Sequence, residues 1–451
     1  MHEETRLHFE RLLLCDGWSS NVRVTIRNGL VAAIHSDAPR EPGDEAHVIG
    51  LPGMPNLHSH AFQRALAGLT ERRGEGEDSF WIWRAEMYRF VEVLDPDAMR
   101  AIAALAYMEM MEAGFTRVGE FHYLHNDPRG QAYADPAEMG AALAQAAEET
   151  GMAMTLLPVF YAQSGFGGQP PAPEQRRFVT GLDGYALLLD ASRKCLEALP
   201  DARIGVAPHS LRAVTLQALA EVVHLADGPI HIHVAEQERE VSDCLASTGA
   251  RPVEWLLANA KVDRNWCLVH ATHVTDAELA GIAGSGAIVG LCPITEANLG
   301  DGLFPAVEAA EQGVRFGIGS DSNVRIDMTE ELRLLEYGQR LVRRRRNCLG
   351  SGGSTGRFLF DGALGGGTRA LGAPPPLAPG APADLVSIAA DHPAMTGRTG
   401  DAMLDSLVFA AGRDAVDCVW RRGRKWVEGG RHRERDAIAA RYASTVKRLA
   451  R

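Results

Sequence analysis

Apolar residues in the middle of the chain recur as short runs that are separated by amphipathic stretches. The runs end at eight positions: His58, Tyr123, Tyr161, His209, Glu236, His273, Pro293 and Asp321. Short apolar runs with helical patterns between them predict parallel β-strands joined by helices. Eight such units close a (β/α)8 barrel, and no dinucleotide-type glycine loop follows the first run. The pattern therefore favours a TIM-type barrel over an open, doubly wound sheet.

The stretch DPDAMRAIAALAYMEMMEAG, residues 95–114, is one of the connections with a helical pattern. Asp95 or Asp97 is a suitable N-cap for this helix, and Gly114 is a suitable stop. Residues 350–382 are rich in Gly and Pro. They predict a loop-rich segment with a short helix at residues 362–371.

The two ends of the chain have a different pattern, in which apolar and polar residues alternate. Residues 1–50 contain such alternation with an Asn28-Gly29 turn signal, and short strand patterns return after residue 382. Alternation with tight turns predicts antiparallel strands. We therefore expect a small β-sandwich domain built from both ends. The predicted parts are residues 1–50 and 376–430 for this small domain, 51–375 for the barrel and 431–451 for a C-terminal helix.

Composition narrows the class of protein further. The chain has 451 residues and a formal net charge of -12, without a dominant basic stripe, which argues against a nucleic-acid partner. Its seven cysteines are odd in number and none pairs as C-x-x-C, so a reducing compartment is expected. No secretory signal pattern and no apolar run of membrane-spanning length is found. We expect a cytoplasmic protein without a membrane partner.

Candidate metal ligands lie at the carboxyl ends of the predicted strands, where barrel enzymes hold their functional groups. His58 and His60 are two residues apart, so both rings lie on one face of a strand. His231 and His233 share a face in the same way. His233 is the favoured ligand because it lies nearer the strand end, and His231 remains the alternative. With Asp321, the set of His58, His60 and His233 suits Zn²⁺, although iron also tolerates it.

Two further groups on the same rim can transfer protons. Glu236 follows His233 by three residues, and His270 directly follows the apolar part of the sixth run. His273 lies in the loop beyond and is expected to be structural. Zinc lowers the pKa of a water ligand to about 7. Together with a general acid and base, such a site predicts hydrolysis.

This ordered set of residues resembles the amidohydrolase superfamily, in its mononuclear deaminase branch. The resemblance covers nearly the whole chain, from the split β domain to the Asp321 at the eighth strand. Members with two bridged metal ions typically carry a carboxylated lysine at the fourth strand. Here that strand ends in VAPHSLR, which contains no lysine. The resemblance therefore implies one metal ion per subunit.

Four stretches narrow the resemblance to the family of formimidoylglutamate deiminases. They are PNLHSHAFQRALAGLTERR, FWIWRAEMYRF, SGFGGQPP and CPITEANLGDGLFP. The resemblance implies hydrolysis of N-formimidoyl-L-glutamate to N-formyl-L-glutamate and ammonia in histidine degradation. It also implies a zinc cofactor and a homodimer. In this mechanism Asp321 and His270 help to deprotonate water, and Glu236 protonates a substrate nitrogen.

The same resemblance assigns the substrate contacts to five residues: Gln63, Arg84, Tyr123, His209 and Arg212. Arg84 is expected in the long loop after the first strand. An acidic protein that binds a dicarboxylate needs local cations, and arginine can bind a carboxylate through two hydrogen bonds.

Two alternative functions remain open from the sequence. A deaminase of a ring amidine, such as a nucleobase or pterin, would use the same metal chemistry with an aromatic-lined pocket. A catalytically silent metal-binding paralogue would keep the fold without turnover, although the intact acid and base residues argue against it.

Overall fold

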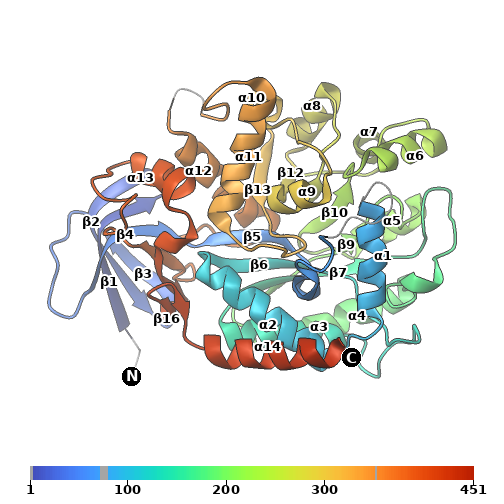
Figure 1. Ribbon diagram of the computed structural model, residues 1–451, viewed down its shortest axis with the longest axis horizontal. Helices are drawn as coiled ribbons and strands as arrows, with labels where there is room; N and C mark the ends of the chain where they lie inside the picture. The colour runs from blue at the N-terminus through green and yellow to red at the C-terminus, as the bar shows by residue number, and fades with distance from the viewer. Residues whose placement is uncertain (1–3, 72–79, 351–352, 451) are drawn as a thin grey trace.

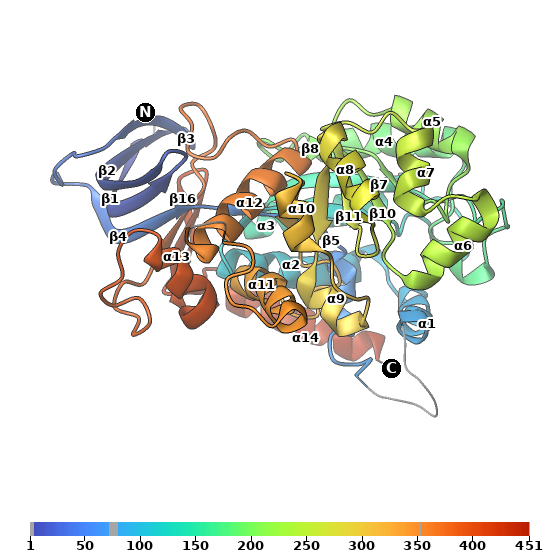
Figure 2. The ribbon, with the colours of Figure 1, turned by 90° about the horizontal axis from the view of Figure 1, so that it is seen from above.

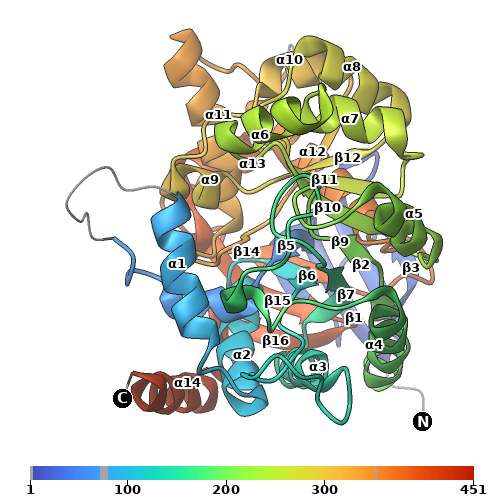
Figure 3. The same ribbon diagram turned by 90° about the vertical axis from the view of Figure 1, so that its right-hand side faces the viewer.

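The computed structural model describes residues 4–71, 80–350 and 353–450. A small β domain lies at one side of the molecule, and a larger body of strands and helices forms the rest (Figure 1). A view from above shows the same separation (Figure 2). In the larger body the strands lie in the middle, with the helices around them (Figure 3).

The strands of the larger body are all parallel and form two sheets. The first holds β5 (Met54–Ser59), β6 (Phe115–His122), β7 (Ala153–Phe160), β8 (Arg203–Ile204) and β9 (Ala207–Pro208). The second holds β10 (Ile230–Val234), β11 (Trp266–His270), β12 (Ile288–Leu291) and β13 (Arg315–Ile318). Bridges from Ser59 to Asp321 and from Val206 to Ile230 join the sheets on both sides. The predicted barrel is thereby confirmed.

The fourth barrel strand is interrupted, so that β8 and β9 together take its place. Gly205 lies between them. A Cβ atom on this residue would meet the carbonyl oxygen of Pro229 at 2.3 Å. Glycine therefore lets the chain approach the start of β10 closely enough for the barrel to close.

The helices of the barrel lie mainly between successive strands. They are α1 (Phe80–Val91), α2 (Pro96–Glu112), α3 (Glu138–Thr150), α4 (Leu182–Cys195), α5 (Leu216–His224), α6 (Glu238–Thr248), α7 (Pro252–Asn259), α8 (Asp276–Ser285), α9 (Pro293–Leu299), α10 (Ala306–Glu311), α11 (Met328–Arg343) and α12 (Thr355–Ala370). In α2 the N-cap is Asp95, whose carboxylate accepts the N–H of Ala98 at 2.7 Å. The stop at Gly114, with φ of 86°, is also as expected.

Helix α12 is longer than predicted, because it begins at Thr355 behind the N-cap Ser354. Its glycines make it look like a loop in sequence. In the fold they let the helix lie directly on β13: a Cβ atom on Gly366 would fall 1.7 Å from the carbonyl oxygen of Phe316. Tertiary packing thus outweighs the weak helix propensity of glycine.

The small β domain is one sheet of eight strands that come from both ends of the chain. Its strands are β1 (Glu4–Leu14), β2 (Gly17–Arg27), β3 (Leu30–His35), β4 (Glu45–Pro52), β14 (Leu385–Ile388), β15 (Val416–Arg421), β16 (Arg424–Glu428) and β17 (Arg431–His432). β4 joins the two groups, since it pairs with β1 on one side and β14 on the other. Asn28 and Gly29 have φ of 51° and 80° and make the predicted turn between β2 and β3.

The remaining α-helices are α13 (Ala402–Ser406) and α14 (Arg435–Leu449). α14 lies along α2 (Figure 1), where Arg448 pairs with Asp95 at 2.8 Å. Every helix in the described part of the chain is too short or too polar to cross a lipid bilayer.

A buried ion network connects the barrel to the small β domain. Asp201 pairs with Arg117 of β6 at 2.6 Å and also with Arg421 of β15, which in turn pairs with Asp384 at 2.9 Å. The side chains of both arginines are 5% exposed. Burial lowers the pKa of Arg117 to about 10, although the nearby Asp201 favours its charged form.

Candidate metal centre and active site

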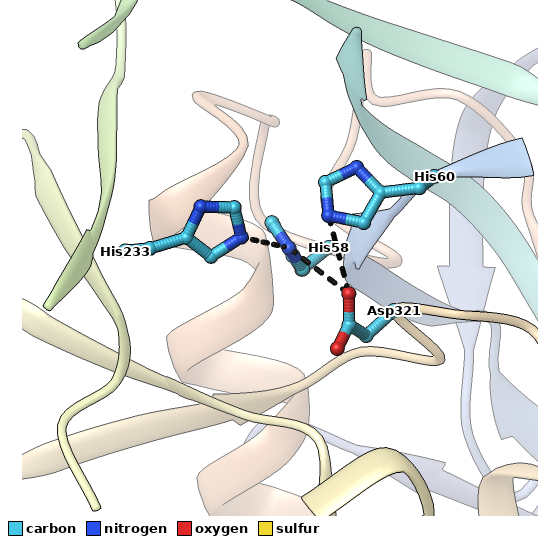
Figure 4. A group of neighbouring side chains, drawn as sticks. All are labelled: His58, His60, His233 and Asp321. Carbon is cyan, nitrogen blue, oxygen red and sulfur yellow. Dashed lines mark hydrogen bonds and ion pairs between the residues drawn. The ribbon is translucent and has the colours of Figure 1, made fainter. Parts of the chain in front are cut away.

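Four side chains converge at the carboxyl ends of β5, β10 and β13 (Figure 4). They are His58, His60, His233 and Asp321, and their candidate ligand atoms all lie within 4.8 Å of one another. His58 Nε2 is 3.0 Å from His233 Nε2. Asp321 Oδ1 lies 3.4 Å from His58 Nε2 and 3.2 Å from His60 Nε2. All four residues are buried.

Hydrogen bonds outside this group set the orientation of two imidazole rings. His60 Nδ1 donates to the carbonyl oxygen of Phe121 at 2.8 Å, and His233 Nδ1 donates to that of His209 at 3.1 Å. Because a carbonyl oxygen only accepts, the proton of each neutral ring is on Nδ1. Each Nε2 therefore presents a lone pair to the centre of the group, as in metal-binding histidines.

The electrostatics of the group also fit a cation. Burial lowers the pKa of His58 to about 3 and that of His233 well below its ordinary value, so both rings stay neutral near pH 7. Burial alone would raise the pKa of Asp321, but hydrogen bonds with His58 and His60 bring it well below the usual range. Three imidazoles and one carboxylate are a donor set for a divalent ion that prefers nitrogen and oxygen ligands.

His231 lies outside this group, although it shares a face of β10 with His233. Its Nε2 donates to the carbonyl oxygen of Ala370, at the end of α12, at 2.7 Å. The ring is therefore held against α12, and the structure brings His233 to the candidate metal centre instead. His273 is also separate, because its Nε2 donates to the carbonyl oxygen of Asp301 at 2.8 Å.

The backbone turns sharply where the strands deliver these side chains. Ala235, His270, Ala271 and Asp321 have φ between 44° and 69°, in the left-handed region. Such a conformation costs a residue other than glycine about 1–3 kcal/mol, and it is concentrated at functional sites. The contacts of the surrounding fold offset this cost. The turns allow the side chains of His270 and Asp321 to reach the barrel rim.

Glu236 and His270 lie beside the candidate metal centre. His270 Nε2 is 3.8 Å from Glu236 Oε1 and 3.9 Å from Asp321 Oδ2. Burial would lower the pKa of His270, but the carboxylates of Glu236, Glu296 and Asp321 raise it to about 10. Burial raises the pKa of Glu236 above its ordinary value. A carboxyl group with a raised pKa next to an imidazole can exchange protons near neutral pH.

Glu296 is a residue that the sequence analysis did not single out. It lies in α9, and its Oε1 is 3.2 Å from His270 Nδ1. The available signal was its place in CPITEANLGDGLFP, directly after the seventh predicted strand, where side chains reach the rim. Nothing in the local pattern indicated that it would meet His270.

All five residues that the sequence analysis expected to contact substrate line one cavity. This cavity is also lined by His60, His233, Glu236, His270 and Asp321. Within it, Gln63 Nε2 donates to the hydroxyl of Tyr123 at 2.8 Å.

Two guanidinium groups stand on the cavity wall. Arg212 Nη2 is 3.9 Å from a carboxylate oxygen of Glu236 and of Glu240. Arg84 donates to the hydroxyl of Tyr88 at 2.5 Å and to that of Tyr161 at 3.4 Å. The prediction that places Arg84 in a loop is wrong, since it lies in α1. Two arginines on one wall make the cavity suitable for anions.

Two protein-family descriptions match this chain, and their matches meet at residues 48 and 49. Residues 49–426 match the "Amidohydrolase family", and residues 4–48 match the "Formimidoylglutamate deiminase HutF, N-terminal domain". The chain is 49% identical over 446 residues to the formimidoylglutamate deiminase of Pseudomonas aeruginosa, with 98% of each chain covered. It is also 28% identical over 393 residues to the 8-oxoguanine deaminase of that organism, covering 83% of this chain and 82% of the relative.

Two solved structures have the same fold. A crystal structure of an amidohydrolase from Brucella melitensis has a TM-score of 0.96 and 51% identity, and the match covers 99% of this chain and 100% of that one. An adenosine deaminase from Xanthomonas campestris, solved with bound zinc, has a TM-score of 0.81 and 22% identity, with 99% and 98% covered.

Proposed function

This chain belongs to the amidohydrolase family, and we propose that it hydrolyses N-formimidoyl-L-glutamate to N-formyl-L-glutamate and ammonia in histidine degradation. The likeness to the Pseudomonas aeruginosa formimidoylglutamate deiminase along the whole chain supports this substrate. The structural observation that carries the proposal is the common cavity. It combines the candidate metal ligands, the Glu236–His270 pair and two arginines on one wall.

We assign one Zn²⁺ per subunit to His58, His60, His233 and Asp321, with Fe²⁺ as the alternative. When bound, the ion supplies Lewis acidity that lowers the pKa of water to about 7 and so provides hydroxide at neutral pH. The protein residues hold the reactants and move the protons.

The proton transfers of the reaction are assigned to three residues. Water adds to the formimidoyl carbon, and one of its protons passes to Asp321, while the protonated ring of His270, 3.9 Å from that carboxylate, stabilises the oxygen that adds. Glu236 delivers a proton to the substrate nitrogen. The proton held by Asp321 then passes to the same nitrogen, the carbon–nitrogen bond breaks and ammonia leaves, while the added hydroxyl returns its remaining proton to Glu236 and becomes the formyl oxygen. Because burial raises the pKa of Glu236, its carboxyl group can hold the proton until it is needed.

The two carboxylates of the substrate are assigned to the arginines of the cavity wall. Arg84 and Arg212 can each bind a carboxylate through two parallel hydrogen bonds. Gln63, Tyr123 and His209 line the same cavity and can donate further hydrogen bonds. Burial lowers the pKa of His209 well below its usual range, so its ring remains neutral and can act as a donor without adding charge.

We also propose that the enzyme is a cytoplasmic homodimer that binds no nucleic acid. All seven cysteines are free thiols, which suits a reducing compartment. Apolar side chains are exposed on one side of α11, where Leu341 is 79% and Val342 66% exposed, and Leu303 nearby is 51% exposed. A second copy of the chain could cover this surface.

A deaminase of a ring amidine is the second candidate, because aromatic side chains also line the cavity. These are Trp83, Tyr88, Tyr123, Tyr161 and Phe178. Such rings could stack on a nucleobase. The paired arginines favour the linear dicarboxylate instead, since a neutral ring offers them no anion.

A turnover assay separates the candidates. The metal-loaded protein should release ammonia and N-formyl-L-glutamate from N-formimidoyl-L-glutamate, and a chelator should abolish both products. Nucleobases and pterins serve as competing substrates in the same assay. Ammonia release from a ring amidine alone, or formation of glutamate and formamide, would refute the proposed reaction.

A further inference from the structure

Glu296 holds the side of His270 that faces away from the cavity. Its Oε1 lies 3.2 Å from His270 Nδ1, and the same oxygen accepts the N–H of Cys292 at 2.9 Å. The residue is 5% exposed. Among the described residues that line the cavity, Thr295 and Leu299 represent α9. Glu296 can therefore influence a bound substrate through His270.

This contact determines which nitrogen of His270 carries a proton. A carboxylate accepts hydrogen bonds, so the Nδ1 atom next to Glu296 must be the donor. The other ring nitrogen, Nε2, is on the opposite side of the imidazole. That atom faces Glu236 Oε1 at 3.8 Å and Asp321 Oδ2 at 3.9 Å. Nε2 thus points to the place where protons are exchanged.

The backbone conformation at His270 is a second reason why the contact with Glu296 matters for the orientation of the ring. Its φ of 69° lies in the left-handed region, and Ala271 follows with φ of 48°. The side chain therefore leaves the strand at a sharp turn. A buried, charged hydrogen-bond partner limits rotation of the ring about its own bonds.

We infer that Glu296 is a positioning residue that keeps His270 with its proton on Nδ1 and its Nε2 directed at the reacting groups. The inference rests on the proposed function for its kinetic consequence. The arrangement is comparable to other carboxylate–imidazole pairs, in which the acid fixes the tautomer and orientation of a catalytic histidine. The assignment gives a second buried carboxylate of the barrel rim a specific role beside Glu236.

A purely structural role for Glu296 is the main alternative, because its carboxylate also binds the N-terminus of α9. Glu331 provides a matched control for that role. It is fully buried, and its Oε2 accepts the N–H of Ile294 in the same first turn at 2.9 Å. Its carboxyl group binds α9, and it is not among the described residues that line the cavity. Both Glu296→Gln and Glu331→Gln keep an acceptor oxygen for the helix and replace one buried carboxyl group.

The kinetic test compares these two variants as metal-loaded enzymes on N-formimidoyl-L-glutamate. Glu296→Gln should lower kcat about 10- to 100-fold, the usual effect of losing such a supporting carboxylate, with KM and metal content nearly unchanged. Glu331→Gln should keep kcat within about 3-fold of the parent value, because a contact that only holds the end of a helix acts on stability first. Equal losses of kcat in both variants, or a parent-like kcat in Glu296→Gln, would overturn the inference.

A spectroscopic test does not depend on the substrate. In protein labelled with ¹⁵N-histidine, the signals of His270 are identified by their loss in His270→Asn. The parent protein should show a protonated Nδ1, and Glu296→Ala, which removes the accepting oxygen, should shift this signal toward the unprotonated form. An unchanged Nδ1 signal would contradict the inference. If the parent protein fails to turn over the substrate while this shift occurs, the proposed function fails and the positioning role stands.

Discussion

Replacing Glu236 by glutamine tests the chemistry of the site most directly. The side chain is buried and lines the cavity, and its Oε1 is 3.8 Å from His270 Nε2. Glutamine has nearly the same shape but cannot release a proton at neutral pH. The variant should therefore keep the fold and the metal while losing the proton delivery to the leaving nitrogen.

The size of the loss follows from the role. A positioned acid–base group contributes about 10²–10⁴-fold to the rate. This corresponds to about 3–5 kcal/mol of transition-state stabilisation. Glu236 is not one of the four candidate ligands, so the metal content of the variant should equal that of the parent. The loss should appear in kcat more than in KM, because a proton transfer acts in the transition state.

Glu240→Gln is the matched control for this variant. Glu240 is fully buried in the first turn of α6. Its carboxylate oxygen lies 3.9 Å from Arg212 Nη2, the same distance as that of Glu236. It does not line the cavity. Ammonia release, metal content and thermal unfolding are measured for both variants. Full turnover by Glu236→Gln, or an equal loss of kcat in Glu240→Gln, would refute the acid–base assignment.

Three other predictions concern binding, the metal and stability. Arg212→Met should raise KM for the dicarboxylate substrate about 10- to 100-fold, because a hydrogen bond to a charged group contributes that much to binding. N-formimidoylglycine lacks one carboxylate and serves as the control. An equal increase of KM for this compound would show that Arg212 does not bind the second carboxylate. His233→Ala should lose the metal in elemental analysis, whereas His231→Gln should retain it; the opposite result would make His231 the ligand. Asp201→Asn should destabilise the fold by about 3–5 kcal/mol, because it leaves Arg117 charged and buried. An unchanged thermal unfolding midpoint would show that the network is dispensable.

Local signals predicted those parts of the fold that depend on short stretches of chain. The cap at Asp95 and the turn at Asn28-Gly29 are formed by residues close to one another in sequence, and both occur where expected. α12 shows the opposite case. Its glycines weaken a helix locally, and only the close contact of Gly366 with β13 makes them favourable.

The candidate site divides in the same way. The sequence by itself determined the eight strand ends and the kinds of groups they carry, because the period of the apolar runs and the spacing of His58 and His60 are local properties. Tertiary structure decided that His233 and not His231 meets them, that Arg84 stands on a helix, and that Glu296 holds His270. These outcomes depend on the closure of the barrel and on helices that return from distant positions. Such contacts join residues that are far apart along the chain, so no local sequence pattern predicts them.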